Sequence, residues 1–157
     1  ENRTREFTLF IPEDFDESTL TPLVINIHGL TSNSFEQQLL SWFNLVADRE
    51  KFLVAYPQGH LTSFAAGPVC CPPANILGVD DVGFIREIVA MIRSRFNVDS
   101  SRIFSTGMSN GSFMSSLISF LCFSFSFLSF FKKKFKKKSI RLACDASDLF
   151  RAIGSVA

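Results

Sequence analysis

Short runs rich in β-branched and aromatic residues alternate along this chain with segments that have helical periodicity. The runs that we expect to form strands are residues 5–11, 22–27, 52–56, 102–106 and 152–156. The segments that we expect to form helices are residues 34–49, a stretch beginning at Asp80 or Asp81, and residues 141–149. Because parallel strands are joined by crossover helices, this alternation predicts an α/β fold, a mostly parallel sheet with helices on both faces. Ser34 and Gln37 have the spacing of a capping box at the start of the first helix.

The size and charge of the chain narrow the classes of function. Its 157 residues suit a single domain, and 46% hydrophobic with 20% charged residues is an ordinary balance for a globular protein. The net charge of +1 provides no global field that would attract nucleic acid, so we expect no nucleic-acid partner. A doubly wound nucleotide-binding domain is also excluded, because no glycine-rich phosphate loop follows the first strand.

The strand expected at residues 102–106 runs directly into a Gly-x-Ser-x-Gly motif, Gly107 to Gly111. In a nucleophile elbow the serine occupies a sharp strand-to-helix turn, and the flanking glycines keep side chains out of the crowded corner. The helix that follows points its free N–H groups at the site. This context favours Ser109 as a catalytic nucleophile over the alternative, a glycine-bounded turn with an incidental serine.

A second loop has the features of an oxyanion hole. His28-Gly29-Leu30-Thr31 follows the strand expected at residues 22–27. Acyl transfer needs two N–H donors aimed at the developing oxyanion, and loss of one typically costs ~10²–10³ in rate. In hydrolases one donor is the residue after the serine, here Asn110, and the other comes from this loop, here Leu30 or Thr31. We expect His28 and Gly29 to support the loop, with His28 bracing it through its ring rather than acting as a base.

The four cysteines bear on redox environment and metal binding. They are Cys70, Cys71, Cys122 and Cys144. None has the spacing of a zinc site, so we expect no metal. In an oxidising compartment they permit one or two disulfides. The glycosylation sequon at residues 2–4 is compatible with secretion.

Several motifs occur together in an order typical of one family. They are His28-Gly29, Cys70-Cys71, residues 79–85, Gly107 to Gly111, residues 141–144 and residues 152–157. With them the chain resembles the polyhydroxybutyrate-depolymerase-like esterases of carbohydrate esterase family one, which include feruloyl and acetylxylan esterases. The resemblance covers nearly the whole chain apart from residues 117–140.

The resemblance implies an α/β-hydrolase fold, secretion to the extracellular space, and no cofactor or metal. It implies hydrolysis of esters on plant polysaccharide or polyester, with Ser109 as nucleophile and Leu30 and Asn110 as oxyanion donors. It also suggests a disulfide between one cysteine of the Cys70-Cys71 pair and Cys144, and of the two we expect Cys71. Asp80 and Asp81 are candidates for the triad acid, but an aspartate at a helix N-cap satisfies free backbone N–H groups, and we prefer that interpretation.

Residues 117–140 depart from the family pattern as a low-complexity insertion. They are almost wholly Phe, Ser, Leu, Ile and Lys, which T-rich and then A-rich codons encode, so our hypothesis is translated intron sequence. Contact with a membrane surface ranks second, since the apolar run of about 15 residues is short of the ~20 that span a bilayer. A lid-like loop ranks third. As written, the insertion is expected to interrupt the helix behind Ser109 after about two turns.

The second departure concerns the catalytic triad, which in this fold runs in the order Ser, acid, His. No histidine follows Ser109; the two histidines, His28 and His60, precede it, and the later acids are Asp145 and Asp148. We therefore interpret residues 1–157 as the N-terminal part of one α/β-hydrolase domain, inactive alone, whose sheet ends on an uncovered edge. The alternative is a non-catalytic carbohydrate- or membrane-binding relative that keeps the fold.

The intron hypothesis makes a prediction about the mature message. Reverse transcription and amplification across codons 117–140 should give a product that lacks these codons and joins the two halves of one helix. A spliced message that contains the segment would contradict the hypothesis.

Overall fold

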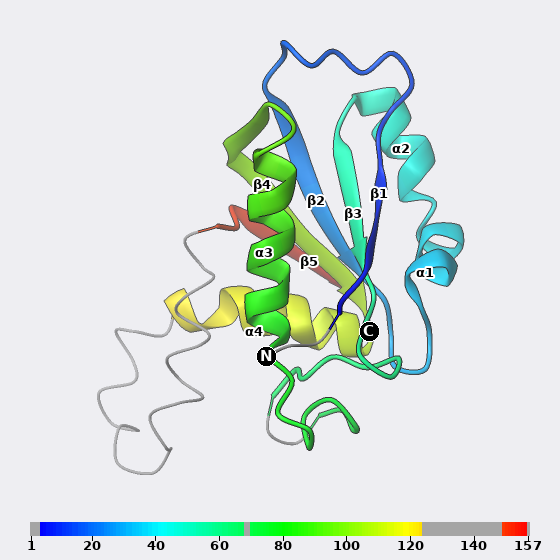
Figure 1. Ribbon diagram of the computed structural model, residues 1–157, viewed down its shortest axis with the longest axis vertical. Coiled ribbons are helices and arrows are strands. Elements are labelled where there is room, and N and C mark those ends of the chain that lie inside the picture. The colour runs from blue at the N-terminus through cyan, green and yellow to red at the C-terminus, as the bar shows by residue number, and fades with distance from the viewer. Residues whose placement is uncertain (1–3, 68–69, 124–148, 157) are drawn as a thin grey trace.

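The computed structural model describes residues 4–67, 70–123 and 149–156. Its strands are β1 (Phe7–Phe10), β2 (Thr21–Ile27), β3 (Leu53–Pro57), β4 (Val98–Met108) and β5 (Ala152–Val156). They form one sheet in the order β1-β3-β2-β4-β5, in which only the β1–β3 pair is antiparallel (Figure 1). The predicted strands and the mostly parallel sheet are confirmed.

Four helices accompany this sheet in the described part of the chain. They are α1 (Ser34–Ser41), α2 (Phe43–Glu50), α3 (Asp81–Arg93) and α4 (Asn110–Phe123). Side chains of α3 and α4 join one apolar cluster, and α2 contributes to a second cluster. The alternation along β2 shows that these clusters lie on opposite faces, since Leu23, Ile25 and Ile27 belong to the first and Val24 to the second. Helices on both faces are therefore confirmed.

The helix predicted for residues 34–49 is two helices. Trp42 separates α1 from α2 with a left-handed backbone, φ 56°. A residue in this conformation cannot continue a right-handed helix, which explains the break. Apolar periodicity spanned both helices, and the sequence showed no glycine or proline to mark the junction.

The cap of α1 lies one residue before the predicted one. Asn33 accepts a hydrogen bond from the backbone N–H of Glu36 at 2.9 Å. The predicted Ser34–Gln37 box is wrong because Ser34 is already helical, and its N–H donates to the side chain of Gln58 at 3.0 Å. A tertiary contact thus satisfies a helix-end donor that the local pattern assigned to a cap.

The helix behind Ser109 is longer than predicted. It continues through Phe123 and so includes the first residues of the insertion, 117–123, rather than ending after two turns. The physical reason is that these residues include neither glycine nor proline, so their backbone can continue the helix. The rest of the insertion and most of the predicted helix 141–149, with Asp145 and Asp148, lie outside the described residues. Within the described part of the chain, none of the helices has the length and apolar character to cross a membrane.

The packing of α3 makes a stability prediction. Ile88 is 1% exposed in the larger cluster, whereas Met91, three residues further on, is 45% exposed. Ile88→Ala should lower the free energy of unfolding by about 2–5 kcal/mol, because it removes buried methyl groups and leaves a cavity. Met91→Ala should change it by less than about 0.5 kcal/mol. Urea denaturation measures both, and equal effects would show that α3 does not pack on the sheet as described.

Candidate active site

Ser109 lies at the turn between β4 and α4 and is exposed, with φ 52°. A positive φ is rare for a residue with a side chain and is maintained only where the surroundings impose it. A Cβ on Gly107 would lie 2.5 Å from the carbonyl carbon of Gly111, and one on Gly111 would overlap the carbonyl oxygen of Ile27. The flanking glycines thus allow the close approach expected of an elbow. The nucleophilic role of Ser109 stays a prediction.

The loop after β2 lies against this turn. A Cβ on Gly29 would lie 3.6 Å from the Cβ of Ser109. The backbone N–H of Thr31 donates to the carbonyl of Thr62 at 3.0 Å, so it is occupied, and Leu30 is the better of the two predicted donors. Asn110 is the first residue of α4, and its N–H therefore has no acceptor within the helix. These contacts support the predicted oxyanion donors without testing them.

His28 is fully buried, and both of its ring nitrogens have partners. Its Nε2 accepts from the N–H of Gly59 at 2.9 Å, so the proton is on Nδ1, which donates to the carbonyl of Gly29 at 2.7 Å. Burial lowers the pKa of His28 from its ordinary 6.5, with the hydrogen bond to Gly29 opposing the shift. A neutral ring bonded at both ends supports the predicted bracing role and has no free nitrogen to act as a base.

Comparisons with known proteins agree with this arrangement. No family model matches the chain. It is 25% identical over 107 residues to a bifunctional acetylxylan esterase/xylanase of Neocallimastix patriciarum, covering 68% of the chain and 14% of the relative. It is 29% identical over 101 residues to poly(3-hydroxyalkanoate) depolymerase C of Paucimonas lemoignei, covering 62% of the chain and 24% of the relative. The chain therefore spans less than a quarter of the length of these relatives.

A solved ferulic acid esterase has the same arrangement of elements. It matches with a TM-score of 0.62 and 16% identity, covering 98% of this chain and 54% of that one. The chain has the α/β-hydrolase fold. The predicted resemblance is confirmed at the level of the fold and of similarity to esterases: the chain is similar in sequence to an acetylxylan esterase and a polyhydroxyalkanoate depolymerase, and in fold to a ferulic acid esterase.

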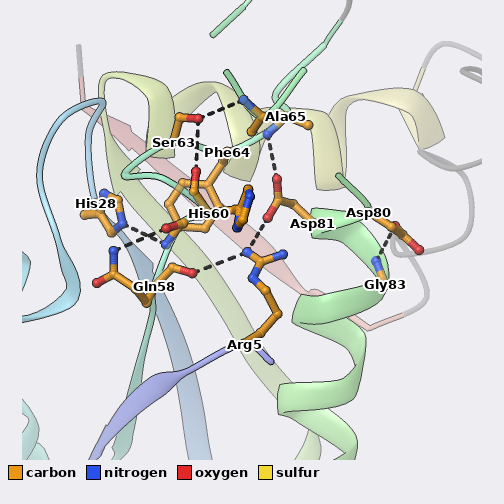
Figure 2. Close-up of polar contacts among 12 residues, drawn as sticks. Arg5, His28, Gln58, His60, Ser63, Phe64, Ala65, Asp80, Asp81 and Gly83 are labelled. Carbon is orange, nitrogen blue, oxygen red and sulfur yellow. Dashed lines mark hydrogen bonds and ion pairs between the residues drawn. The ribbon is translucent and has the colours of Figure 1, made fainter. Parts of the chain in front are cut away.

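The two aspartates at the start of α3 have different roles. Asp80 accepts from the N–H of Gly83 at 2.8 Å, which confirms the predicted N-cap. Asp81 is buried and turns away from the cap, toward Arg5 at 2.6 Å and the N–H of Ala65 at 2.7 Å (Figure 2). Burial raises the pKa of Asp81, and its hydrogen bonds with Ala65 and Arg5 counter the shift.

Sequence reasoning missed the part played by the side chain of Asn110. It is buried and binds the backbone of Phe64 twice: Oδ1 accepts from the N–H at 2.8 Å, and Nδ2 donates to the carbonyl at 3.0 Å. Arg5 was missed as well, although it pairs with Asp81 and lies 4.0 Å over the ring of Phe84. The presence of Asn110, a polar residue inside the elbow motif, was the available signal. The sequence did not indicate its partner, Phe64, because that residue is 46 positions away.

The structure joins Cys71 to its neighbour Cys70, and Cys144 lies outside the described residues. The predicted disulfide between Cys71 and Cys144 stays a prediction. Among the described residues, no group of three His, Cys, Asp or Glu side chains could hold a metal ion. The predictions of no metal and no cofactor stay predictions.

The buried neutral state of His28 makes stability depend on pH. Its folded pKa is lowered, so the unfolded chain binds more protons as the pH falls below 6.5. The contribution of His28 is therefore present above that pH and lost below it. We expect His28→Gln to flatten the fall in the free energy of unfolding between about pH 6.5 and 5.

Urea denaturation across this range measures the difference between the two pH curves. His60→Gln, which alters the other histidine of the chain, is measured in parallel as the control. If His28→Gln had the same pH dependence as the wild type, His28 would not be the buried neutral group described above.

Proposed function

We propose that this chain is the N-terminal part of a serine ester hydrolase in which Ser109 forms an acyl-enzyme. The observation that carries the proposal is the left-handed backbone of Ser109, φ 52°, with the Gly29 loop packed against it. Strain of this kind in a strand-to-helix turn is typical of a nucleophile elbow. The similarity to esterases supports the same reaction class.

The proposed reaction follows from the groups around Ser109. Its Oγ attacks the ester carbonyl carbon, while the hydroxyl proton passes to a general base. The N–H groups of Leu30 and Asn110 stabilise the oxyanion. Collapse of the tetrahedral intermediate breaks the bond to the alcohol, which leaves with the proton, and water then releases the acid from Ser109. His28 is not the base, since both its nitrogens are bonded.

The substrates we propose are carboxylic esters of plant polysaccharide, feruloyl or acetyl, or a polyhydroxyalkanoate. Their support is the printed activities of the similar proteins, an acetylxylan esterase, a polyhydroxyalkanoate depolymerase and a ferulic acid esterase. Secretion and an extracellular location belong to the same proposal, and the glycosylation sequon at residues 2–4 is compatible with them.

The 157-residue chain has no histidine after Ser109, so we predict little or no turnover of p-nitrophenyl acetate. A chain extended by the encoded downstream residues, with an acid and a histidine at hydrolase spacing, should be active. In that longer chain Ser109→Ala should lower kcat by ~10⁴–10⁶, since the nucleophile is lost. Release of p-nitrophenol measures both.

Ser94→Ala, at the exposed C-cap of α3, is the matched control and should retain activity. Activity in the extended chain that survives Ser109→Ala would overturn the proposal. Robust turnover by the 157 residues alone, abolished by Ser109→Ala, would contradict only their inactivity and would implicate His60, the other histidine of the chain. An extended chain with no activity that still binds polysaccharide would favour a non-catalytic relative.

A further inference from the structure

The loop from Gly59 to Ala65 contains a turn that its own sequence disfavours. The N–H of Ser63 donates to the carbonyl of His60 at 3.1 Å, which closes a four-residue turn. Its central residues, Leu61 and Thr62, have φ 48° and 60°. Positive φ at both positions is the pattern of a type I′ turn, which favours Asn-Gly. A leucine and a β-branched threonine are strained there, so surrounding contacts must impose the conformation.

Three buried side chains from other elements hold this loop. His28, at the end of β2, accepts from the N–H of Gly59. Asn110, at the start of α4, binds both backbone groups of Phe64. Asp81, in the first turn of α3, accepts from the N–H of Ala65 (Figure 2). The strained turn therefore lies between anchors on both sides.

The ion pair with Arg5 links both ends of the loop. Arg5 donates to Asp81 at 2.6 Å and to the carbonyl of Gln58, the residue before the loop, at 3.3 Å. Its side chain is 12% exposed and that of Asp81 is 0% exposed, so little solvent screens the pair. Asp81 is thereby fixed in the orientation that accepts from Ala65.

The strained turn touches the candidate oxyanion loop through one hydrogen bond. The carbonyl of Thr62 accepts from the N–H of Thr31, which itself has φ 67° and follows Leu30 directly. Gly29, two residues before Thr31, packs on Ser109. The position of Thr62 thus sets the backbone that carries one proposed oxyanion donor.

From these contacts we infer that Asp81 and the side chain of Asn110 are positioning residues that hold the strained Leu61–Thr62 turn, and through Thr62 the oxyanion loop, against Ser109. They act on the ester through other groups and do not touch it. An effect of Asp81 and Asn110 on ester hydrolysis rests on the proposed function. Their effect on the position of the Leu61–Thr62 turn and of Thr31 does not.

The experiment measures amide hydrogen exchange of Thr31 in the full 157-residue chain by mass spectrometry with residue-level fragmentation. Asp81→Asn removes the charge that binds Ala65 and Arg5, and it should speed exchange at Thr31 by about tenfold. Asp80→Asn is the matched control on the same helix end; it removes a charge, keeps an oxygen that can accept from Gly83, and should leave Thr31 unchanged. Asn110→Ser, which withdraws the contacts with Phe64, should act like Asp81→Asn and provides the second variant should one of them fail to fold.

A second experiment removes the backbone strain of the Leu61–Thr62 turn. Leu61→Asn with Thr62→Gly installs the residues that a type I′ turn favours, so the turn should hold without its anchors. Added to Asp81→Asn, this pair should return Thr31 exchange to within about twofold of the wild-type rate. A merely structural role for Asp81 predicts no such rescue.

Two results would overturn the inference: equal Thr31 exchange in Asp81→Asn and Asp80→Asn, or failure of the relief pair to restore protection. Neither depends on turnover. If the inference holds while Ser109→Ala leaves esterase activity intact in the extended chain, the proposed function fails alone. If Ser109→Ala abolishes that activity and Thr31 does not respond to Asp81, the positioning role fails alone.

Discussion

The site depends on one close backbone contact, where the corner between β4 and α4 meets the end of β2. Gly107 and Gly111 approach the carbonyls of Ile27 and His28 so closely that neither position has room for a side chain. The parallel register pairs Ile27 with Gly107, so the contact follows from the sheet itself. It brings two loops, from strands about 80 residues apart, to the same carboxyl edge, where Ser109 and Gly29 become neighbours.

Around that contact, three buried polar side chains bind the backbone of one loop. His28 accepts from the N–H of Gly59, Asn110 binds the N–H and the carbonyl of Phe64, and Asp81, which also pairs with Arg5, accepts from the N–H of Ala65. Each bond adds only about 1 kcal/mol net, but a buried partner left unsatisfied costs about 1–3 kcal/mol. These hydrogen bonds therefore add little to the free energy of folding but select one position of the loop, since any other position leaves buried polar groups unpaired. Such a frame can maintain backbone conformations that isolated residues avoid, as at Leu61 and Thr62.

Much of this was predictable from local sequence. Strand runs and the elbow depend on neighbours in the chain, so β2 and β4 and the place of Ser109 followed from short patterns. Prediction failed where the local sequence carried no signal, or where a residue distant in the chain supplied a hydrogen bond that the local pattern assigned to a neighbour. The helix at 34–49 breaks at Trp42 with no glycine to announce it, and Gln58 takes the N–H of Ser34 that a capping box would have assigned locally.

Local sequence patterns were sufficient to predict the fold class and the elbow, because hydrophobic periodicity and a glycine-flanked serine involve residues only a few positions apart. The side chains that hold the site could be identified only from tertiary contacts. The partners of Asp81 are 16 and 76 residues away, and that of Asn110 is 46 away. Hydrogen bonds between a side chain and a remote backbone leave no period or spacing in the sequence, so they exist only once the sheet has brought the segments together.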